Sequence, residues 1–144
     1  MNNFVYCNTV KIVFGRGTIS KIRDLLPPAA RVLLLYGGGS IKRNGVYEQA
    51  VRALSGHTWK EFSGIEPNPH YETCLKAVDV IKAEELHFIL AVGGGSVADA
   101  AKFIAAAVKY TETQDPWDMM EIRTVPRDAL PLGVVLTPPA TGPE

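Results

Sequence analysis

The sequence predicts an α/β fold in which a mostly parallel sheet carries helices on both faces. Segments typical of strands alternate with segments typical of helices along the 144 residues, and two apolar strands run directly into glycine-rich turns. Such alternation favours right-handed crossovers between parallel strands. A composition of 47% hydrophobic and 21% charged residues is typical of a packed domain of this length. We therefore expect residues 1–144 to form a single domain.

The elements follow in order from the local patterns. Residues 9–14 form the first predicted strand, which we expect at an edge of the sheet, and residues 18–26 form the first predicted helix. A continuous apolar run at 32–36 predicts a strand buried on both faces, and it precedes an amphipathic helix at 45–54 and a strand at 58–62. The first half of the chain thus supplies three predicted strands.

A long helix is predicted at residues 69–84, because Asn68 is a good N-cap and Pro69 suits the first helical turn. We expect one buried stripe along it, made of Cys74, Leu75, Ala77, Val78 and Ile81. The remaining predicted elements are a strand at 88–92, a helix at 96–110, a short helix at 116–122 and a strand at 132–137. Asp115 and Asp118, which flank Pro116 and Trp117, are typical of a helix start.

The junction at residues 88–102 is suited to binding phosphate. Gly93, Gly94 and Gly95 carry no Cβ atoms, so an anion can approach the backbone where the next helix offers unpaired N–H groups. Residues 93–98 also satisfy the dinucleotide fingerprint G-x-G-x-x-G/A between a strand and a helix. Each part has a structural alternative, because Ser96 and Asp99 together form a capping-box pattern and Lys102 suits a solvated helix face.

A second glycine turn, YGGGSIKR at residues 36–43, ends the predicted strand at 32–36. No acid stands there to take ribose hydroxyls. Backbone donors from Gly37, Gly38 and Gly39, with Ser40, Lys42 and Arg43 beside them, suit an additional phosphate. The alternative is a surface turn with two solvated cations.

Four segments together resemble the iron-dependent (group III) alcohol dehydrogenases. These are GGGSVADAAK at 93–102, TPPATGPE at 137–144, NTVKIVFG at 8–15 and GIEPNP at 64–69, and all occur in the family's order. The resemblance implies a Rossmann-like fold of the type found in the N-terminal domain of dehydroquinate synthase. It is closest to the NADP-preferring members, of the butanol dehydrogenase and broad-specificity aldehyde reductase type. Glycerol dehydrogenase and dehydroquinate synthase share the glycine turn, but not the Thr-x-Pro-Ala-Thr-Gly segment.

The resemblance implies NADP as the cofactor, in preference to NAD, and assigns roles to single residues. Gly94, Gly95 and Ser96 would bind the diphosphate, and Gly38, Gly39 and Ser40 the 2′-phosphate of adenosine. Thr137 and Thr141 would lie near the ribose or nicotinamide, and Asp99 on the nicotinamide side of the cleft. The remaining cofactor-binding residues implied are Gly37, Asn68 and Gly93. Pro143, where relatives usually carry serine, removes an N–H group and a hydroxyl from this cleft.

In complete relatives a divalent metal, iron or zinc, polarises the carbonyl during hydride transfer between NADPH and an aldehyde or primary alcohol. The metal is bound by an Asp and three His of a helical domain, and we expect that domain to be absent from this chain. His57, His70 and His87 form no spaced cluster with carboxylates, so we assign neither a metal ligand nor a catalytic residue. We expect the chain to be inactive alone.

Three functional classes therefore remain: the nucleotide-binding part of a dehydrogenase, a stand-alone nucleotide-binding or assembly module, and a nonfunctional relic. The zero net charge disfavours nucleic acid as a partner, and apolar runs too short to span a bilayer disfavour a membrane. Cys7 and Cys74, in no paired motif, favour free thiols in the cytoplasm. We expect a homodimer, paired through residues 9–14, or a partner chain that supplies the helical domain.

Overall fold

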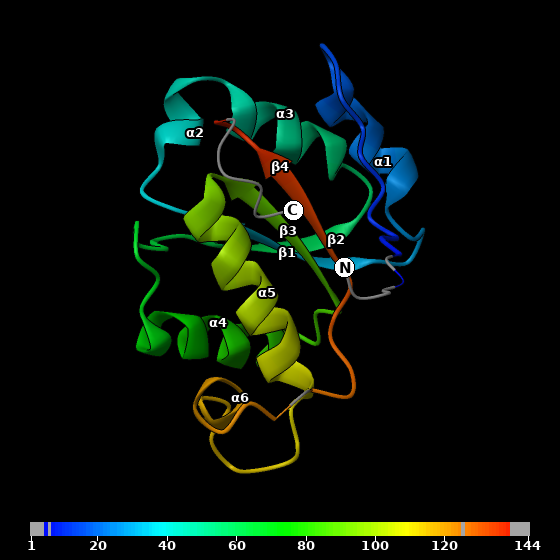
Figure 1. Ribbon diagram of the computed structural model, residues 1–144. Helices are drawn as coiled ribbons and strands as arrows, with labels where there is room; N and C mark the ends of the chain where they lie inside the picture. The colour runs from blue at the N-terminus through cyan, green and yellow to red at the C-terminus, as the bar shows by residue number, and fades with distance from the viewer. Residues whose placement is uncertain (1–4, 6, 125, 139–144) are drawn as a thin grey trace.

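The computed structural model describes residues 5, 7–124 and 126–138. Its centre is a parallel sheet of four strands in the order β2-β1-β3-β4 (Figure 1). The strands are β1 (Arg31–Tyr36), β2 (Thr58–Phe62), β3 (Phe88–Gly93) and β4 (Leu132–Leu136). The helices are α1 (Ile22–Leu25), α2 (Ser40–Arg43), α3 (Val46–Ala53), α4 (Tyr71–Ala83), α5 (Gly95–Lys109) and α6 (Asp118–Glu121), with a 3₁₀ turn at Thr18–Lys21 before α1.

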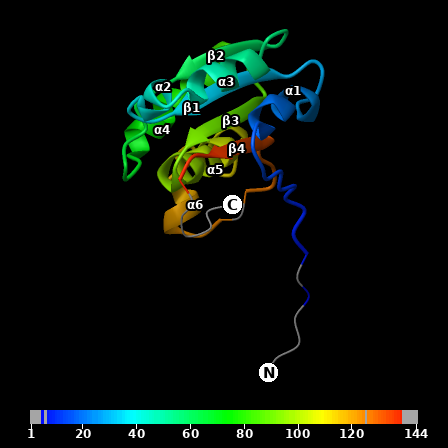
Figure 2. The same cartoon turned by 90° about the horizontal axis from the view of Figure 1, so that it is seen from above.

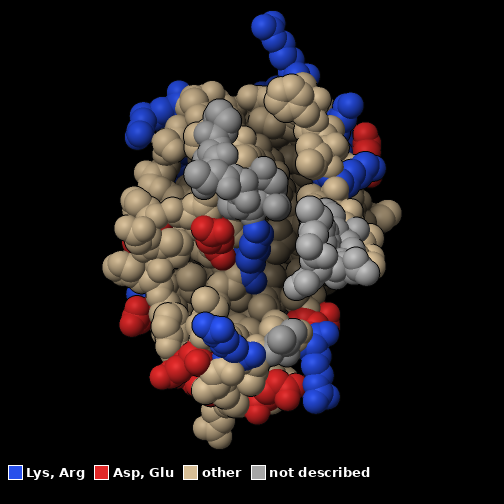
Figure 3. All heavy atoms as spheres, viewed as in Figure 1, with Lys and Arg blue, Asp and Glu red and all other residues tan. Residues whose placement is uncertain are grey.

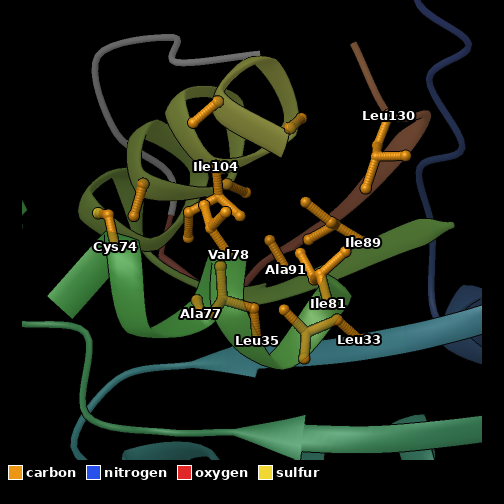
Figure 4. Close-up of a cluster of buried hydrophobic side chains, with 14 of the residues drawn as sticks. Leu33, Leu35, Cys74, Ala77, Val78, Ile81, Ile89, Ala91, Ile104 and Leu130 are labelled. Atoms are coloured by element: carbon orange, nitrogen blue, oxygen red, sulfur yellow. The ribbon is translucent and has the colours of Figure 1, made fainter. Parts of the chain in front are cut away.

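Helices cover both faces of the sheet, as the sequence predicted, because alternate residues of the central strands enter two separate cores. Leu33 and Leu35 of β1 pack with α4 and α5, and Figure 4 shows this core. Val32 and Leu34 face the other way and pack with α1 and α3. Figure 2, seen from above, shows the four strands side by side with α3 lying over them. Continuous apolar runs in β1 and β3 thus follow from burial on both faces.

The strand order reverses its direction at β1. The chain crosses from β1 to β2 on one side, then returns past β1 to β3 on the other. In open α/β sheets, ligands bind outside the carboxyl ends of the strands at such a switch point. The carboxyl ends of β1 and β3, which carry the two glycine turns, meet there.

The predicted edge strand at residues 9–14 is wrong for this structure. The segment forms no ladder, because the described residues place no strand beside it whose backbone could complete the hydrogen bonds. Its apolar side chains are consequently exposed: Val10 by 54%, Ile12 by 75% and Phe14 by 97%. The helix predicted at 18–26 is split into the 3₁₀ turn and α1.

Helix α4 begins two residues later than predicted, with His70 as its N-cap. The cap of Asn68 is replaced by Glu66, whose Oε2 accepts the His70 N–H at 3.4 Å and whose Oε1 accepts the Thr73 hydroxyl at 2.6 Å. The Thr73 bond is the main cause that lowers the pKa of Glu66. The predicted stripe is otherwise buried, although Leu75 is only half-buried.

The other boundaries agree with the predictions to within a few residues. Strand β2 has the predicted bounds, and Asp115 accepts the Trp117 N–H at 2.9 Å just before α6. Within the described part of the chain, no helix combines the length and the apolar character needed to cross a membrane.

Candidate functional site: a cleft between two glycine turns

A cleft of about 430 Å³ opens where the two glycine turns meet. Gly38 lines it on the β1 side, residues 94–97 line it at the start of α5, and residues 64–67 form the remaining wall. The cleft therefore lies at the switch point of the sheet, where the fold class predicts a ligand.

The first residues of helix α5 line this cleft. The N–H groups of Val97 and Ala98 donate to the Gly94 carbonyl, at 3.1 and 3.2 Å. Gly95 and Ser96, one step earlier, have N–H groups for which the described residues provide no acceptor. Free amides and the positive end of the dipole of a 15-residue helix together favour an anion.

The two turns contain glycine for two different structural reasons, close packing and open space. A Cβ atom on Gly93 would lie 2.8 Å from the Val97 Cγ2, and one on Gly37 would lie 3.1 Å from the Ile65 carbonyl. These two positions require glycine for close packing. Gly38 and Gly39 have no atoms within 4 Å of such a Cβ, so space is open beside them, and Gly39 has a φ of +93°.

The wall at residues 64–67 is tied to both turns. The N–H of Gly64 donates to Gly37 O at 3.1 Å, and that of Ile65 to Tyr36 O at 3.3 Å. Across the cleft, the Ser96 hydroxyl donates to the carbonyl of Pro67. The structural alternative, a capping box at Ser96 and Asp99, does not form, because Gly94 is the N-cap and the Ser96 hydroxyl bonds to the opposite wall.

The structure separates the other predicted cofactor residues. Thr137 is half-buried, and its N–H donates to Gly93 O at 2.9 Å, which brings it beside the glycine turn. Asn68 is exposed on the loop before α4, one residue past the cleft wall. Thr141 and Pro143 lie outside the described residues.

Asp99 lies in the first turns of α5 but lines a second cavity of about 200 Å³, between α4, α5 and α6. Aromatic side chains surround it: Tyr71 packs edge-on against Phe103 and Trp117, at centroid distances of 5.9 and 5.4 Å. The Tyr71 hydroxyl donates to Asp115. Burial, helped by this carboxylate, raises the pKa of Tyr71 to about 12.

The first glycine turn carries a set of contacts that sequence reasoning missed. Lys42, predicted to lie beside an additional phosphate, places its Nζ 5.3 Å from the ring centroid of Tyr36 and 4.7 Å from that of Tyr47. Both hydroxyls donate to Oε2 of Glu61, at 3.1 and 2.8 Å. The one local signal was Tyr36 at the end of a buried strand, since a buried tyrosine hydroxyl needs a partner. Arg43 is exposed.

Ionisable groups are dispersed elsewhere. Basic and acidic side chains are interspersed over the face seen in Figure 3. Among residues 5, 7–124 and 126–138, no three His, Cys, Asp or Glu side chains lie close enough together to hold a metal ion.

Comparison with known proteins agrees with this geometry. The family model "Iron-containing alcohol dehydrogenase" matches residues 9–144. The NADPH-dependent aldehyde reductase YqhD of Escherichia coli is 50% identical over 145 residues, which cover 100% of this chain and 38% of that protein. Its crystal structure superposes with a TM-score of 0.93 at 49% identity, covering 97% of this chain and 36% of the other.

A second solved structure, the NADH-dependent butanol dehydrogenase A of Thermotoga maritima, gives a TM-score of 0.89 at 47% identity, covering 98% of this chain and 36% of that one. The chain thus spans less than two-fifths of the length of these relatives. The resemblance inferred from the four sequence segments is confirmed: the chain belongs to the iron-containing alcohol dehydrogenase family.

Proposed function

We propose that the cleft binds NADP(H) and that the chain provides the nucleotide-binding part of an NADP-dependent alcohol dehydrogenase or aldehyde reductase. The observation that supports this most strongly is that Gly95 and Ser96, whose amides have no acceptor among the described residues, line a cleft of about 430 Å³ at the switch point. A dinucleotide diphosphate matches both the charge and the position of these donors.

Each part of the cleft has a proposed share of the dinucleotide. Gly94, Gly95 and Ser96 bind the diphosphate, and Ser96 does so through its amide, since its hydroxyl is bonded to Pro67. Gly37, Gly38, Gly39 and Ser40 receive the adenosine 2′-phosphate, because the turn is open beside Gly38 and Gly39. Thr137, whose N–H donates to Gly93 O, adjoins the nicotinamide half, whereas Asp99 lines the second cavity.

NADP is proposed over NAD because no acid ends β1 and because Lys42 adjoins the first glycine turn. The relatives alone do not decide this, since one is named as NADPH-dependent and another as NADH-dependent. A bound nicotinamide cofactor would exchange a hydride with an aldehyde or primary alcohol. The described residues do not fit the family's metal, because no three-ligand cluster occurs among them. We therefore propose that the chain alone binds the dinucleotide without reducing aldehydes.

The test compares two glycine variants by titrating the purified chain with NADP⁺. Gly38→Ala adds a methyl group where no protein atom lies within 4 Å, on a residue that lines the cleft. Gly133→Ala, the control in β4, adds a methyl group at ordinary contact distances from Phe88 and Leu90. We expect Gly38→Ala to weaken NADP⁺ binding about tenfold, or about 1.4 kcal/mol, without loss of thermal stability, and Gly133→Ala to leave binding unchanged. Equal affinity in all three proteins, or no binding at all, would overturn the proposal.

A homodimer formed through residues 9–14 is the proposed assembly. Val10, Ile12 and Phe14 lie exposed on every second position, so two copies could pair their backbones and cover this apolar row. Sedimentation of the wild-type chain at micromolar concentration should show a dimer that Ile12→Ser shifts toward monomer. A monomeric wild-type protein would contradict this assembly.

A further inference from the structure

Four side chains from four different elements meet beside the first glycine turn, and we call them the tyrosine cluster: Tyr36 of β1, Lys42 of α2, Tyr47 of α3 and Glu61 of β2. The two tyrosine rings pack edge to face, with centroids 5.7 Å apart. Tyr36 is only 2% exposed, so the cluster is anchored in the core. Since Gly37 follows Tyr36 directly, this anchor lies next to the turn.

The sheet register explains why Glu61 reaches the tyrosines. Glu61 pairs with Leu34 on the neighbouring strand, so its side chain leaves the sheet on the same face as Leu34 and Tyr36. That face is covered by α3, which carries Tyr47. Both hydroxyls then donate to one carboxylate oxygen, and the bond from Tyr47 is the main cause that lowers the pKa of Glu61. The carboxylate is thus charged and fixed at the hydroxyl ends of the rings.

Lys42 contacts the same two rings. Its ammonium lies over the two ring faces, in the geometry of a cation–π contact, whereas Glu61 lies at the hydroxyl ends. Neither residue takes part in the ion pairs of the described residues. The Lys42 backbone N–H donates to Gly39 O at 3.0 Å, so this cation is connected directly to the glycine turn. The two opposite charges therefore contact the same pair of rings without forming a direct ion pair, although the Lys42 charge still helps the tyrosine hydroxyls to lower the pKa of Glu61.

We propose that the tyrosine cluster sets the preference for a 2′-phosphorylated dinucleotide. The rings hold the Lys42 ammonium beside the glycine turn, where it attracts the phosphate, and the hydroxyls retain the Glu61 carboxylate, which would otherwise pair with Lys42 and repel the phosphate. This inference rests on the proposed NADP site.

The test is a double-mutant cycle in which NADP⁺ and NAD⁺ are titrated side by side. Tyr47→Phe keeps the ring beneath Lys42 but removes one hydroxyl from Glu61. We expect the Kd for NADP⁺ to rise about threefold to tenfold, while that for NAD⁺ changes less than about twofold. Adding Glu61→Gln to Tyr47→Phe should return the NADP⁺ value to within about twofold of wild type. Thermal unfolding of each variant checks that the fold is intact.

The role of the cation is tested with matched charge deletions. Lys42→Met preserves the aliphatic stem and should weaken NADP⁺ about tenfold with little effect on NAD⁺. Lys60→Met, which removes a cation paired with Glu84 on the surface, should change neither. Equal effects of Tyr47→Phe on both dinucleotides, or no recovery with Glu61→Gln, would overturn the inference and leave the proposed function intact. A wild-type chain that binds neither dinucleotide would overturn the proposed function itself.

Discussion

Replacing Gly93 by alanine tests whether the junction between β3 and α5 requires a residue without a side chain. The new Cβ would lie 2.8 Å from the Val97 Cγ2 and 3.2 Å from its Cβ, whereas carbon atoms in ordinary contact are about 3.5–4.0 Å apart. One of the two residues must therefore move by about 1 Å. Both are buried, and Val97 belongs to the first turn of a helix, so the shift displaces the start of α5.

Overpacking of this kind costs about 1–3 kcal/mol. A Gly93 φ of +158°, which other residues rarely adopt, removes the entropic benefit that alanine usually gives. For a chain of 144 residues, the melting temperature should fall by about 3–12 °C in a calorimetric scan. Dinucleotide affinity should fall as well, because the amides of Gly95 and Ser96 move with the helix.

Two comparisons make the Gly93 prediction specific. Gly38→Ala, with open space around its Cβ, should unfold at the wild-type temperature or above it. Val97→Ala removes the obstructing methyl groups, so the double variant should be less destabilised than the sum of the two single variants. The steric reasoning is refuted if Gly93→Ala has the same melting temperature as Gly38→Ala, or if the destabilisations caused by Gly93→Ala and Val97→Ala simply add.

Three other residues give predictions that standard assays can check. The hydrogen bond from Thr73 lowers the pKa of Glu66, so the stability that the Glu66 carboxylate contributes is present at neutral pH and is lost as the pH falls through that lowered pKa. In denaturant unfolding, Glu66→Gln should therefore be less stable than wild type at pH 7 and equally stable in acid, and a difference that does not change with pH would contradict this. The pKa of Tyr71 is raised to about 12, so its protonated hydroxyl stabilises the folded state below the ordinary tyrosine pKa, and this stabilisation is lost as the pH rises through about 12. In an absorbance titration, Tyr71→Phe should remove the most alkaline phenol transition, and an unchanged curve would contradict this. Burial raises the pKa of Cys74 to about 11, so an alkylating reagent at pH 8 should modify only the exposed Cys7 in the native protein and both thiols in denaturant. Rapid alkylation of both cysteines in the native protein would contradict this prediction.

The sequence carried enough information for the sheet because its strongest signals are local. The apolar runs that became β1 and β3 predict burial on both faces without reference to any other segment, and the strand at 58–62 has the bounds that its pattern indicated. Residues 9–14 are also rich in apolar, β-branched side chains, but a strand requires a neighbour, and local composition alone does not supply one. The predicted start of α4 was wrong for a related reason, since Glu66 accepts the N–H of His70, four residues later, and this contact overrides the local preference of Asn68.

The candidate site divides in the same way. Glycine turns between strands and helices are visible in the chain itself, and both of them line or adjoin the cleft. The tyrosine cluster is not visible there, because its members lie in four elements that only the folded register brings together. The Ser96 hydroxyl likewise bonds to a carbonyl 29 residues away, a contact that a local capping pattern cannot anticipate.

The hydrogen bond from Ser96 to Pro67 joins the two walls of the cleft, so both walls together determine the width of its opening. The N–H groups of Gly64 and Ile65 donate to the carbonyls of Gly37 and Tyr36, so the segment at residues 64–67 connects the first glycine turn to the second. A ligand wider than the present opening would have to break the hydrogen bond from Ser96 to Pro67, and the amides of Gly64 and Ile65 would then exchange with solvent more readily. Deuterium uptake at these two amides would therefore distinguish a ligand that slides into a ready-made slot from one that forces the rims apart.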